Sequence, residues 1–372
     1  MKFLFFSSAV WDYYQRLTPL CAELARLGHT VVFVEPIRYA GALPAHLDPS
    51  RSTPVPPGVQ VVRRQSVLRR GVSLALLQNM RNLHALRQHK PDVAVLSDVA
   101  FGLAPALYLR FSRTKAVLDY IDDWPEWSRV PWERWTLRHI LVPTVARLAD
   151  VCTVTAERLG DDLRRHARRV AYVPNGTADP PPPLDEDAFH GGSGVLYVGG
   201  LTDRIDVALL VELARQMPNV PVTALGDGPQ RGCLREAARC VPNLHAPGPV
   251  PHEEAMQAIR TAAVCLVPYV PSRLTDRCFP IKLAEYWACG KAVVASDTHE
   301  VRRVGEGRLR IYQNASEAVA AVQSLLNNPQ ERATLGKAGY EAVRDCYNYR
   351  ALALRFLSAA CDDDTVQETM TS

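Results

Sequence analysis

Short apolar runs alternate with amphipathic helical patterns along most of the chain, and this alternation restricts the fold more than any other feature of the sequence. In the first half the pattern predicts strands at Phe3–Phe6, Thr30–Val34, Val93–Leu96, Ala116–Tyr120, Val151–Val154 and Arg169–Val173. Helices are predicted between them, at Gln15–Leu27, Leu74–His89, Gly102–Phe111 and Trp132–Leu148. Strands that alternate with helices in this way form a parallel sheet covered on both faces. The first half is therefore predicted to be a doubly wound α/β domain.

A run of four prolines at 180–183 interrupts the pattern, because proline suits neither a helix interior nor a central strand. Beyond it the alternation starts again, with strands expected at Gly194–Val198, Val222–Leu225, Val264–Pro268 and Ala292–Ala295. Helices are expected at Val207–Gln216, Gln230–Cys240 and Ile281–Ala288. We therefore predict a first Rossmann-like domain over 1–178, a proline-rich linker over 179–193, a second Rossmann-like domain over 194–361 and a disordered tail over 362–372. The last helix of the second domain is expected to pack back on the first.

Charge is divided unevenly between the two halves. Residues 1–180 contain 24 Lys and Arg against 16 Asp and Glu, whereas residues 181–372 contain 19 against 23. A basic half indicates an anionic partner such as a phosphate or a phospholipid surface, and the alternative is a set of scattered, solvated arginines.

The cysteines and the apolar runs indicate a cytoplasmic protein. No two of the nine cysteines are spaced as Cys-x-x-Cys, so neither a structural zinc site nor a disulfide framework is expected. The start of the chain reads as a first strand rather than as a signal peptide. No stretch of about 18 residues is apolar and free of charges, so no membrane-spanning helix is expected.

Two glycine-rich segments follow predicted strands of the second half. Gly199-Gly200 and Gly226-Asp227-Gly228 stand where ligands bind in open parallel sheets, beyond the carboxyl ends of the strands. Glycine would let the backbone approach a ligand closely, although a tight turn without a ligand is the other interpretation. Neither segment is Gly-x-Gly-x-x-Gly, and there is no Walker sequence, so an NAD enzyme and a P-loop ATPase are not supported.

The segment from Cys278 to Ser296 is the most informative part of the sequence. Pro280 suits the first turn of a helix, and Lys282 and Glu285 fall on one face of that helix close to its start. A lysine beside the positive end of a helix dipole suits a diphosphate, and a glutamate one turn later can accept hydrogen bonds from a ribose diol. The alternative is an ordinary surface Lys–Glu pair.

This segment, with the turns at 199–201 and 226–229, resembles the donor domain of GT-B glycosyltransferases. It is most similar to family 4-like enzymes of cell-surface polysaccharide assembly, of the teichuronic acid type, and to xanthan glucuronosyltransferases. In the first half Leu148–Thr155, Val173–Gly176 and the loop Asp122-Asp123-Trp124 match segments that recur in this group. The resemblance spans roughly residues 1–350. It implies two Rossmann-like domains facing a cleft and transfer of a hexose-type sugar from a nucleoside diphosphate, such as UDP, to an acceptor.

The resemblance also implies the residues of the donor site. Lys282, with Arg204 and the Gly199-Gly200 turn, would bind the diphosphate, and Glu285 would hold the ribose. The remaining residues that it assigns to donor binding are Gly226, Asp227, Gly228, Arg277, Pro280 and Ile281. No cofactor and no metal ion are expected, because the basic side chains would neutralise the leaving diphosphate.

One position departs from the family pattern. Retaining family 4 enzymes commonly carry a glutamate eight residues before the ribose-binding glutamate, whereas this chain has Arg277 there, preceded by Asp276. Both the retaining and the inverting outcome therefore stay open. An inverting transfer needs a general base, for which the candidates are Asp122, Asp123 and Asp12, each on a loop after a strand. The other interpretation of the aspartate pair is that one of them caps the next helix.

Aromatic and basic side chains of the first half indicate the kind of acceptor. Trp124, Trp127, Trp132 and Trp135 lie within twelve residues, and they suit either a sugar or a membrane interface, or else a core cluster. With Arg63, Arg64, Arg69, Arg70, Arg81 and Arg87 they favour an amphiphilic or anionic acceptor, such as a lipid-linked saccharide on the inner membrane face. The alternatives are a cytosolic natural-product glycosyltransferase, a nucleotide-sugar epimerase of the same architecture and a non-catalytic sugar-nucleotide binding protein. Nucleic acid is not an expected partner.

The donor sugar is indicated by two arginines of the second half. Arg273 and Arg277 could pair with the carboxylate of a uronic acid donor.

Overall fold

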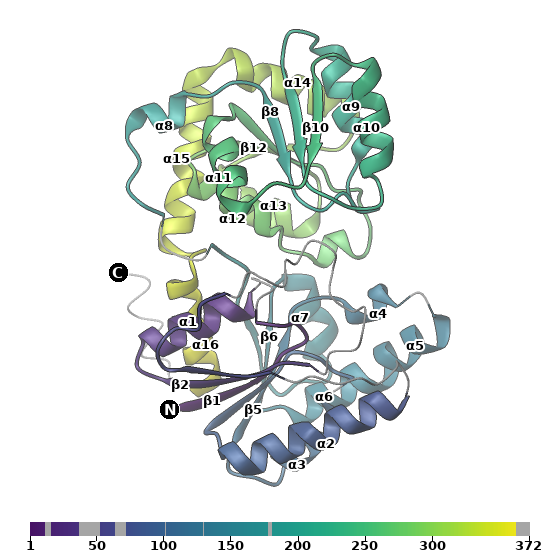
Figure 1. Ribbon diagram of the computed structural model, residues 1–372, viewed down its shortest axis with the longest axis vertical. Coiled ribbons are helices and arrows are strands. Elements are labelled where there is room, and N and C mark those ends of the chain that lie inside the picture. Colours follow the sequence, from purple (N-terminus) through teal and green to yellow (C-terminus); the bar gives the residue numbers. More distant parts are fainter. Residues whose placement is uncertain are drawn as a thin grey trace. The chain divides into compact units, whose positions relative to one another are not determined.

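The computed structural model describes residues 1–11, 16–36, 53–63, 72–100, 102–128, 130–177 and 181–361, without the side chains of 72–76. The chain forms two compact units, each built on one parallel sheet (Figure 1). Unit 1 comprises Met1–Pro174 and Tyr349–Ser372, and unit 2 comprises Asn175–Asn348. The predicted α/β class, with two doubly wound parallel sheets, is confirmed.

Unit 1 contains a seven-stranded sheet in the order β3-β2-β1-β4-β5-β6-β7. Its strands are β1 (Lys2–Phe6), β2 (Thr30–Val34), β3 (Val59–Val62), β4 (Val93–Leu96), β5 (Lys115–Tyr120), β6 (Val151–Val154) and β7 (Val170–Tyr172). Its helices are α1 (Leu17–Arg26), α2 (Val72–His89), α3 (Leu103–Leu109), α4 (Trp124–Trp127), α5 (Pro131–Thr136), α6 (Val142–Leu148), α7 (Glu157–Arg164) and α16 (Tyr349–Cys361). α1 and α16 cover one face of the sheet, whereas α2, α3 and α6 cover the other (Figure 1).

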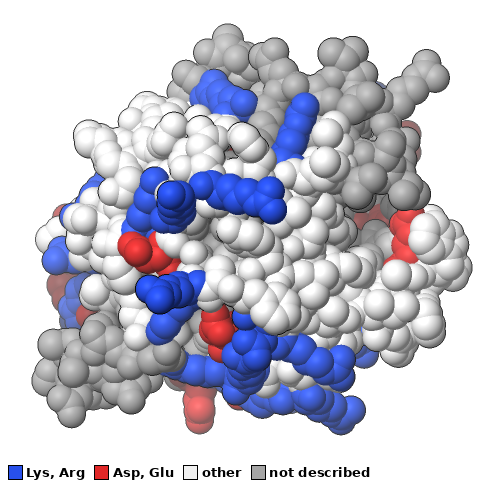
Figure 2. Space-filling view, turned by 90° about the horizontal axis from the view of Figure 1, so that it is seen from below, with Lys and Arg blue, Asp and Glu red and all other residues white. Residues whose placement is uncertain are grey.

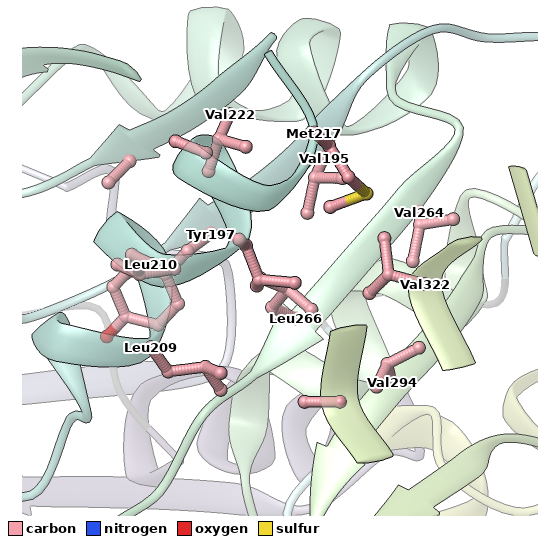
Figure 3. Packing of buried hydrophobic residues seen from close by; sticks show 14 of the residues in the cluster. Val195, Tyr197, Leu209, Leu210, Met217, Val222, Val264, Leu266, Val294 and Val322 are labelled. Atoms are coloured by element: carbon pink, nitrogen blue, oxygen red, sulfur yellow. The ribbon is translucent and has the colours of Figure 1, made fainter. Parts of the chain in front are cut away.

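Unit 2 contains a six-stranded sheet in the order β10-β9-β8-β11-β12-β13. Its strands are β8 (Val195–Val198), β9 (Val222–Leu225), β10 (Leu244–Gly248), β11 (Val264–Val267), β12 (Ala292–Ser296) and β13 (Arg310–Tyr312). Its helices are α8 (Glu186–His190), α9 (Val207–Gln216), α10 (Arg231–Cys240), α11 (His252–Thr261), α12 (Ile281–Ala288), α13 (His299–Gly305), α14 (Ala315–Asn327) and α15 (Pro329–Asp345), with a 3₁₀ turn at Thr275–Arg277. Figure 3 shows one side of its core, where strand residues such as Val195, Leu266 and Val294 meet Leu210 of α9 and Val322 of α14.

Most predicted elements are confirmed to within two residues, and Gly28 ends α1 with the positive φ of +86° expected at a helix C-terminus. The helix predicted at Trp132–Leu148 is not continuous, because a π-helical turn at Leu137–Leu141 separates α5 from α6. Pro143 has no N–H to donate to the preceding turn, and this interrupts the regular ladder of hydrogen bonds. The hydroxyl of Thr144 instead donates to the Ile140 carbonyl at 2.6 Å.

The unit boundaries differ from the predicted ones. Unit 2 begins at Asn175 rather than at 194, and the expected linker at 179–193 contains the helix α8. The Tyr340 hydroxyl donates to the Pro182 carbonyl at 2.9 Å, and Phe189 packs against Tyr340, so this proline-rich segment is part of unit 2. At the other end α16 returns to unit 1, where Phe356 stacks on Phe5. The tail predicted to be disordered, 362–372, lies outside the described residues.

A buried ion pair joins four segments of unit 1. The Arg16 guanidinium donates to both carboxylate oxygens of Asp119, at 3.0 and 3.1 Å, and it also donates to the Pro174 carbonyl. The Thr153 hydroxyl donates to the same carboxylate at 2.7 Å. Arg16 precedes α1, Asp119 and Thr153 lie on β5 and β6, and Pro174 is the last residue of the first segment of unit 1. The hydrogen bonds of this ion pair therefore link the start of α1, the strands β5 and β6 and the end of the first segment of unit 1.

We expect Arg16→Met to lower the free energy of unfolding of unit 1 by about 3–5 kcal/mol, because Asp119 would remain buried without its counter-charge. The matched control is Arg164→Met, which removes the partner of the exposed Asp161 and should cost no more than about 1 kcal/mol. Urea denaturation of the two variants measures the difference. Equal losses would mean that the buried pair has no special role.

Candidate functional site

In unit 2 the loops after β8 and β11 meet where the strand order of the sheet reverses. β8 and β11 are neighbours in the sheet, although β9 and β10 lie between them in the sequence. Ligands of doubly wound sheets bind at this reversal, beyond the carboxyl ends of the strands. The Gly199-Gly200 turn follows β8, and α12 with its preceding loop follows β11. The candidate site is therefore built on this edge of unit 2.

The glycines of the loops after β8 and β9 have different functions. A Cβ atom on Gly226 would lie 1.8 Å from the Gly199 carbonyl oxygen, and one on Gly228 would lie 2.4 Å from the Leu201 carbonyl oxygen. Both have positive φ angles, so they let one loop backbone pack directly on the other. A Cβ on Gly200 would meet nothing closer than 3.7 Å. Gly200 is exposed, and the folded chain leaves space for a ligand beside it.

The helix α12 carries the predicted lysine and glutamate on one face. Pro280 lies at its N-cap, and the exposed Ile281 is its first helical residue. The Lys282 ammonium donates to the Glu285 carboxylate at 2.8 Å, and both side chains are partly exposed. A lysine so close to the start of a helix adds its charge to the positive end of the helix dipole. The pair therefore gives an anion and a neighbouring diol complementary partners.

Tyr286, which the sequence analysis did not single out, attaches α12 to the end of β8. Its buried hydroxyl accepts a hydrogen bond from the Val198 N–H at 2.9 Å and donates to the Val198 carbonyl at 3.3 Å. Burial is the main cause that raises the pKa of Tyr286 well above its ordinary value, and the phenol stays neutral. Val198 immediately precedes Gly199, so this clamp sets the position of the glycine turn relative to Lys282 and Glu285. The motif contained the tyrosine, but nothing in its spacing indicated this contact.

Arg204 ties the loop after β8 to the loop after β11. Its carbonyl accepts the Val270 N–H at 2.8 Å, and the adjacent Ile205 bridges to Tyr269. Burial raises the pKa of both Tyr197 and Tyr269, and the charge of Arg204 opposes that shift in each. The guanidinium group therefore lies close to both phenols at this edge of the sheet. Asp227, which was also predicted, is exposed and pairs with Arg231 at 3.4 Å.

The position that departs from the family pattern lies on the loop before α12. Asp276 accepts the His299 N–H at 3.0 Å, so its carboxylate caps the start of α13. Arg277 is partly buried, and its guanidinium donates to the Arg273 carbonyl at 3.5 Å. Asp276 thus has a structural function in the loop.

The second lysine of the motif has a structural contact. Lys291 is buried and donates to the Ala188 carbonyl of α8 at 3.0 Å. Burial lowers its pKa from the ordinary value. Lys291 therefore holds α8 against the sheet, and Lys282 is the lysine of this motif that stands at the candidate site.

In unit 1 the aspartate pair follows the carboxyl end of β5. Asp122 is partly buried, whereas Asp123 is buried and occupies the N-cap position of α4 without a side-chain capping bond. Burial raises the pKa of Tyr120 well above its ordinary value, and the charges of Asp123, Asp162 and Asp122 raise it further. The two aspartates therefore lie near this phenol. Asp12 lies outside the described residues.

The predicted tryptophan cluster is divided between interior and surface. Trp127, Trp132 and Trp135 are 47%, 66% and 57% exposed, so a core cluster is the wrong interpretation for these three, whereas Trp124 packs partly buried against the core. Nearby, Arg138 pairs with Glu126, and Arg134 donates to the Ser128 carbonyl at 3.0 Å. Seen from the side of α2 and α3, unit 1 displays more basic than acidic groups (Figure 2).

The arginines singled out at 63–70 are described only in part. Arg63 is exposed, while Arg64, Arg69 and Arg70 lie outside the described residues. Within the described ranges, no group of three or more His, Cys, Asp or Glu side chains is arranged to hold a metal ion. No helix among those residues is long and apolar enough to cross a bilayer.

Both halves of the chain match glycosyltransferase families. Residues 14–176 match the family described as glycosyl transferase 4-like domain, and residues 204–358 match the family described as glycosyl transferase-like. The chain is 26% identical over 330 residues to the phosphatidyl-myo-inositol mannosyltransferase of Mycolicibacterium smegmatis, which covers 84% of this chain and 80% of the relative. It is 27% identical over 117 residues to TuaH of Bacillus subtilis, named for teichuronic acid biosynthesis, over 30% of this chain and 29% of the relative.

Solved structures share the fold over the full length of the chain. The sucrose-phosphate synthase of Thermosynechococcus elongatus has a TM-score of 0.73 at 17% identity, and all of both chains is covered. HepE of Anabaena, solved in complex with UDP, has a TM-score of 0.65 at 14% identity, over 100% of this chain and 99% of that chain. The expected GT-B fold is thereby confirmed.

We expect Tyr286→Phe to lower the free energy of unfolding of unit 2 by about 1–3 kcal/mol, because both backbone groups of Val198 would lose their buried partner. It should also weaken the binding of a nucleoside diphosphate, since the glycine turn loses its attachment to α12. Tyr340→Phe is the control, because it also removes a tyrosine hydroxyl, one that donates to carbonyls of the proline-rich segment and not to the glycine turn. Urea denaturation and calorimetric titration with UDP measure both effects. Unchanged UDP affinity in Tyr286→Phe would contradict the positioning role.

Proposed function

Because the chain is a family 4-like glycosyltransferase of GT-B fold that uses a nucleotide-sugar donor, we propose that it moves a hexose onto a lipid-linked acceptor. The observation that carries the donor half of this proposal is the Lys282–Glu285 pair at the start of α12. The acceptor half is supported by the exposed tryptophans of unit 1 and by the relative that is named for a phosphatidylinositol acceptor. The partial similarity to TuaH supports a place in cell-surface polysaccharide assembly, as the sequence motifs suggested.

In the proposed donor complex the diphosphate lies beside Gly200 and Lys282. The ammonium of Lys282 exchanges its contact with Glu285 for the phosphate oxygens, and the freed carboxylate accepts hydrogen bonds from the ribose diol. Arg204 adds a second positive charge. Gly199, Gly226, Asp227 and Gly228 shape the nucleotide pocket, and Pro280 and Ile281 set the start of α12. UDP is the proposed nucleotide, and its presence in the HepE complexes supports that choice.

The same two cations would stabilise the charge that develops on the leaving diphosphate. Fixed positive groups aimed at a developing negative charge can supply much of the rate enhancement of an enzyme. We therefore propose that transfer requires no metal ion and continues in excess EDTA. Arg277 would contact the donor sugar, and a uronic acid is the sugar whose carboxylate it would pair with best.

Unit 1 would bind the acceptor and provide the general base of an inverting transfer. Asp123 or Asp122 removes the proton from the acceptor hydroxyl while its oxygen attacks the anomeric carbon and the diphosphate leaves. Asp12 is the third candidate. The exposed tryptophans support a peripheral location, because indole side chains are favoured at the interface between a membrane and water. We propose that the enzyme works at the inner face of the membrane.

Lys282→Ala should weaken donor binding by about 1.5–3 kcal/mol and slow transfer, because the diphosphate loses a charge-assisted contact. Glu285→Ala should chiefly raise the donor KM, since ribose contacts are similar in the ground and transition states. Thermal shifts with UDP, GDP and dTDP, followed by steady-state kinetics with a panel of nucleotide sugars, measure these effects. Lys337→Ala, which breaks an exposed pair with Glu186, is the control. If no nucleotide raises the Tm of the wild type, the donor site is wrongly assigned.

We expect either Asp122→Asn or Asp123→Asn to lower kcat by about 10²–10⁴-fold. UDP affinity should change little, because a general base acts only in the chemical step. The control is Asp161→Asn, at an exposed aspartate of α7 that pairs with Arg164. The anomeric configuration of the product, read by NMR, distinguishes inversion from retention. Retention of configuration would exclude the base mechanism. Isomerisation of the donor without any acceptor would favour an epimerase.

Replacing Trp132 and Trp135 by Ser should lower retention on phosphatidylglycerol vesicles, because two exposed indoles no longer reach the interface. Replacing Arg63, Arg64, Arg69 and Arg70 by Gln should lower it further at low salt, since each basic residue near anionic lipid contributes about 1 kcal/mol. Vesicle sedimentation at two salt concentrations gives the result, and Arg215→Gln on α9 of unit 2 is the control. If the wild type is not retained at low salt, a soluble natural-product acceptor becomes the better account.

A further inference from the structure

A cavity of about 300 Å³ opens at the amino ends of β4 and β5 in unit 1. It is lined by Leu86, Arg87, Lys90, Pro91, Tyr108, Ser112 and Thr114. The first four stand at the end of α2 and before β4, and the others stand at the end of α3 and before β5. The catalytic candidates Asp122 and Asp123 follow the opposite end of β5, roughly 17 Å away along the strand. The cavity is therefore separate from the edge at which parallel sheets bind their substrates.

The charge of the cavity is positive. Within the described part of the chain no carboxylate pairs with Arg87 or Lys90, nor with Arg110 or Arg113 at the end of α3. The nearby carboxylate of Asp92 accepts the Lys2 backbone N–H at 2.7 Å. Unpaired cations at the rim of a cavity attract anions.

The backbone of Lys90 is strained. Its φ is +45°, and among the described residues it alone has a positive φ without being glycine. It follows the end of α2, where glycine is the usual residue, and it precedes Pro91, which disfavours such a conformation further. Strain of this kind persists only where the surrounding structure imposes it, and it clusters at active sites and ligand-binding sites. A lysine at this position brings an ammonium group to the cavity, which glycine could not do.

The remaining lining groups indicate the chemistry of the occupant. The Ser112 and Thr114 hydroxyls donate to the carbonyls of Leu109 and Pro91, at 3.0 and 2.7 Å, so their protons are already used. Arg87 and Lys90 are then the charged donors toward a ligand. The Arg87 guanidinium lies 5.7 Å from the centre of the Tyr108 ring, which offers a flat apolar surface beside the charge. Leu86 and Pro91 add apolar surface.

We propose that this cavity binds a phosphate ester, with the phosphate held by Arg87 and Lys90 and the carbon skeleton against Tyr108, Leu86 and Pro91. The ester is either a small soluble molecule or the headgroup of an anionic phospholipid. Charge-assisted hydrogen bonds from two cations suit a phosphate of either source. The proposal does not depend on the donor site, because none of its residues belongs to that site, and of its residues only Arg87 was among the arginines that favoured an anionic acceptor.

Calorimetric titration of the full chain with glycerol 3-phosphate tests the soluble form of the site. We expect saturable binding that is weakened about tenfold or more by Arg87→Gln and by Lys90→Gly, since each variant removes a charge-assisted contact. Lys90→Gly should also leave the Tm unchanged or raise it, because the backbone strain is relieved. Arg113→Gln is the matched control, since it removes a nearby cation that does not line the cavity, and it should change the affinity less than about threefold.

Vesicles of phosphatidylglycerol distinguish the two sources of phosphate. Lower retention of Arg87→Gln and Lys90→Gly on these vesicles, with Arg113→Gln like the wild type, supports a lipid headgroup. Binding of glycerol 3-phosphate with unchanged vesicle retention supports a soluble ester. The proposal is overturned if the wild type binds neither probe, or if Arg113→Gln weakens binding as much as the cavity variants. A UDP-induced thermal shift that is equal in all variants separates this result from any failure of the donor site.

Discussion

The buried ion pair of Arg16 and Asp119 is the interaction on which the geometry of unit 1 depends. Removing two charges from water is costly, and the cost is offset here because the hydrogen bonds of Arg16 and Thr153 surround the carboxylate. The same guanidinium holds the Pro174 carbonyl. Asp119 lies three residues before Asp122 on the same segment of chain. The position of the proposed general base therefore depends on a carboxylate whose two oxygens are both engaged in hydrogen bonds.

In unit 2 a neutral side chain, Tyr286, fixes the position of the loop after β8. The Tyr286 hydroxyl satisfies both backbone groups of Val198, and the loops after β8 and β9 pack on each other through Gly226 and Gly228. A clamp made of one neutral hydroxyl and close backbone contacts carries no cost of burying charge. It leaves Lys282 and Glu285 as charged side chains that are free to change partners when a ligand arrives. The rigid part and the adaptable part of the proposed donor site are thus separate sets of residues.

The basic character of the first half has more than one structural origin. Several arginines, among them Arg16 and Arg138, are used inside unit 1 in pairs with carboxylates. Others, such as Arg87, Arg110 and Arg113, have no such partner among the described residues and stand at the amino edge of the sheet. The exposed tryptophans belong to α4 and α5, which follow the opposite edge. A net charge counted from sequence cannot separate these groups, since only the fold distributes them over different surfaces.

The sequence by itself determined the strands and helices that it predicted, the parallel character of both sheets and the Lys282–Glu285 pair, because these depend on periodicity and spacing within a few turns of chain. It did not predict β3, β10 and β13, nor α7, α11 and the helices from α13 to α15. It also predicted that Gly199, Gly200, Gly226 and Gly228 follow strands of the second half, but it could not tell which of them the packing requires. Tertiary structure alone decided that Gly226 and Gly228 serve loop packing, that Gly200 is open to a ligand and that Lys291 supports α8.

The contacts that sequence reasoning missed join residues far apart in the chain. Arg16 meets Asp119, Tyr286 meets Val198, and Tyr340 meets the proline-rich segment that the composition had suggested was a linker between the domains. α16, by contrast, belongs to unit 1, as the sequence analysis expected of the last helix. No local pattern encodes such pairings, because the apolar face of a helix or strand indicates that it is buried without indicating its partner. The elements were therefore decided by local sequence, and the unit boundaries and the roles of single side chains were decided by long-range packing.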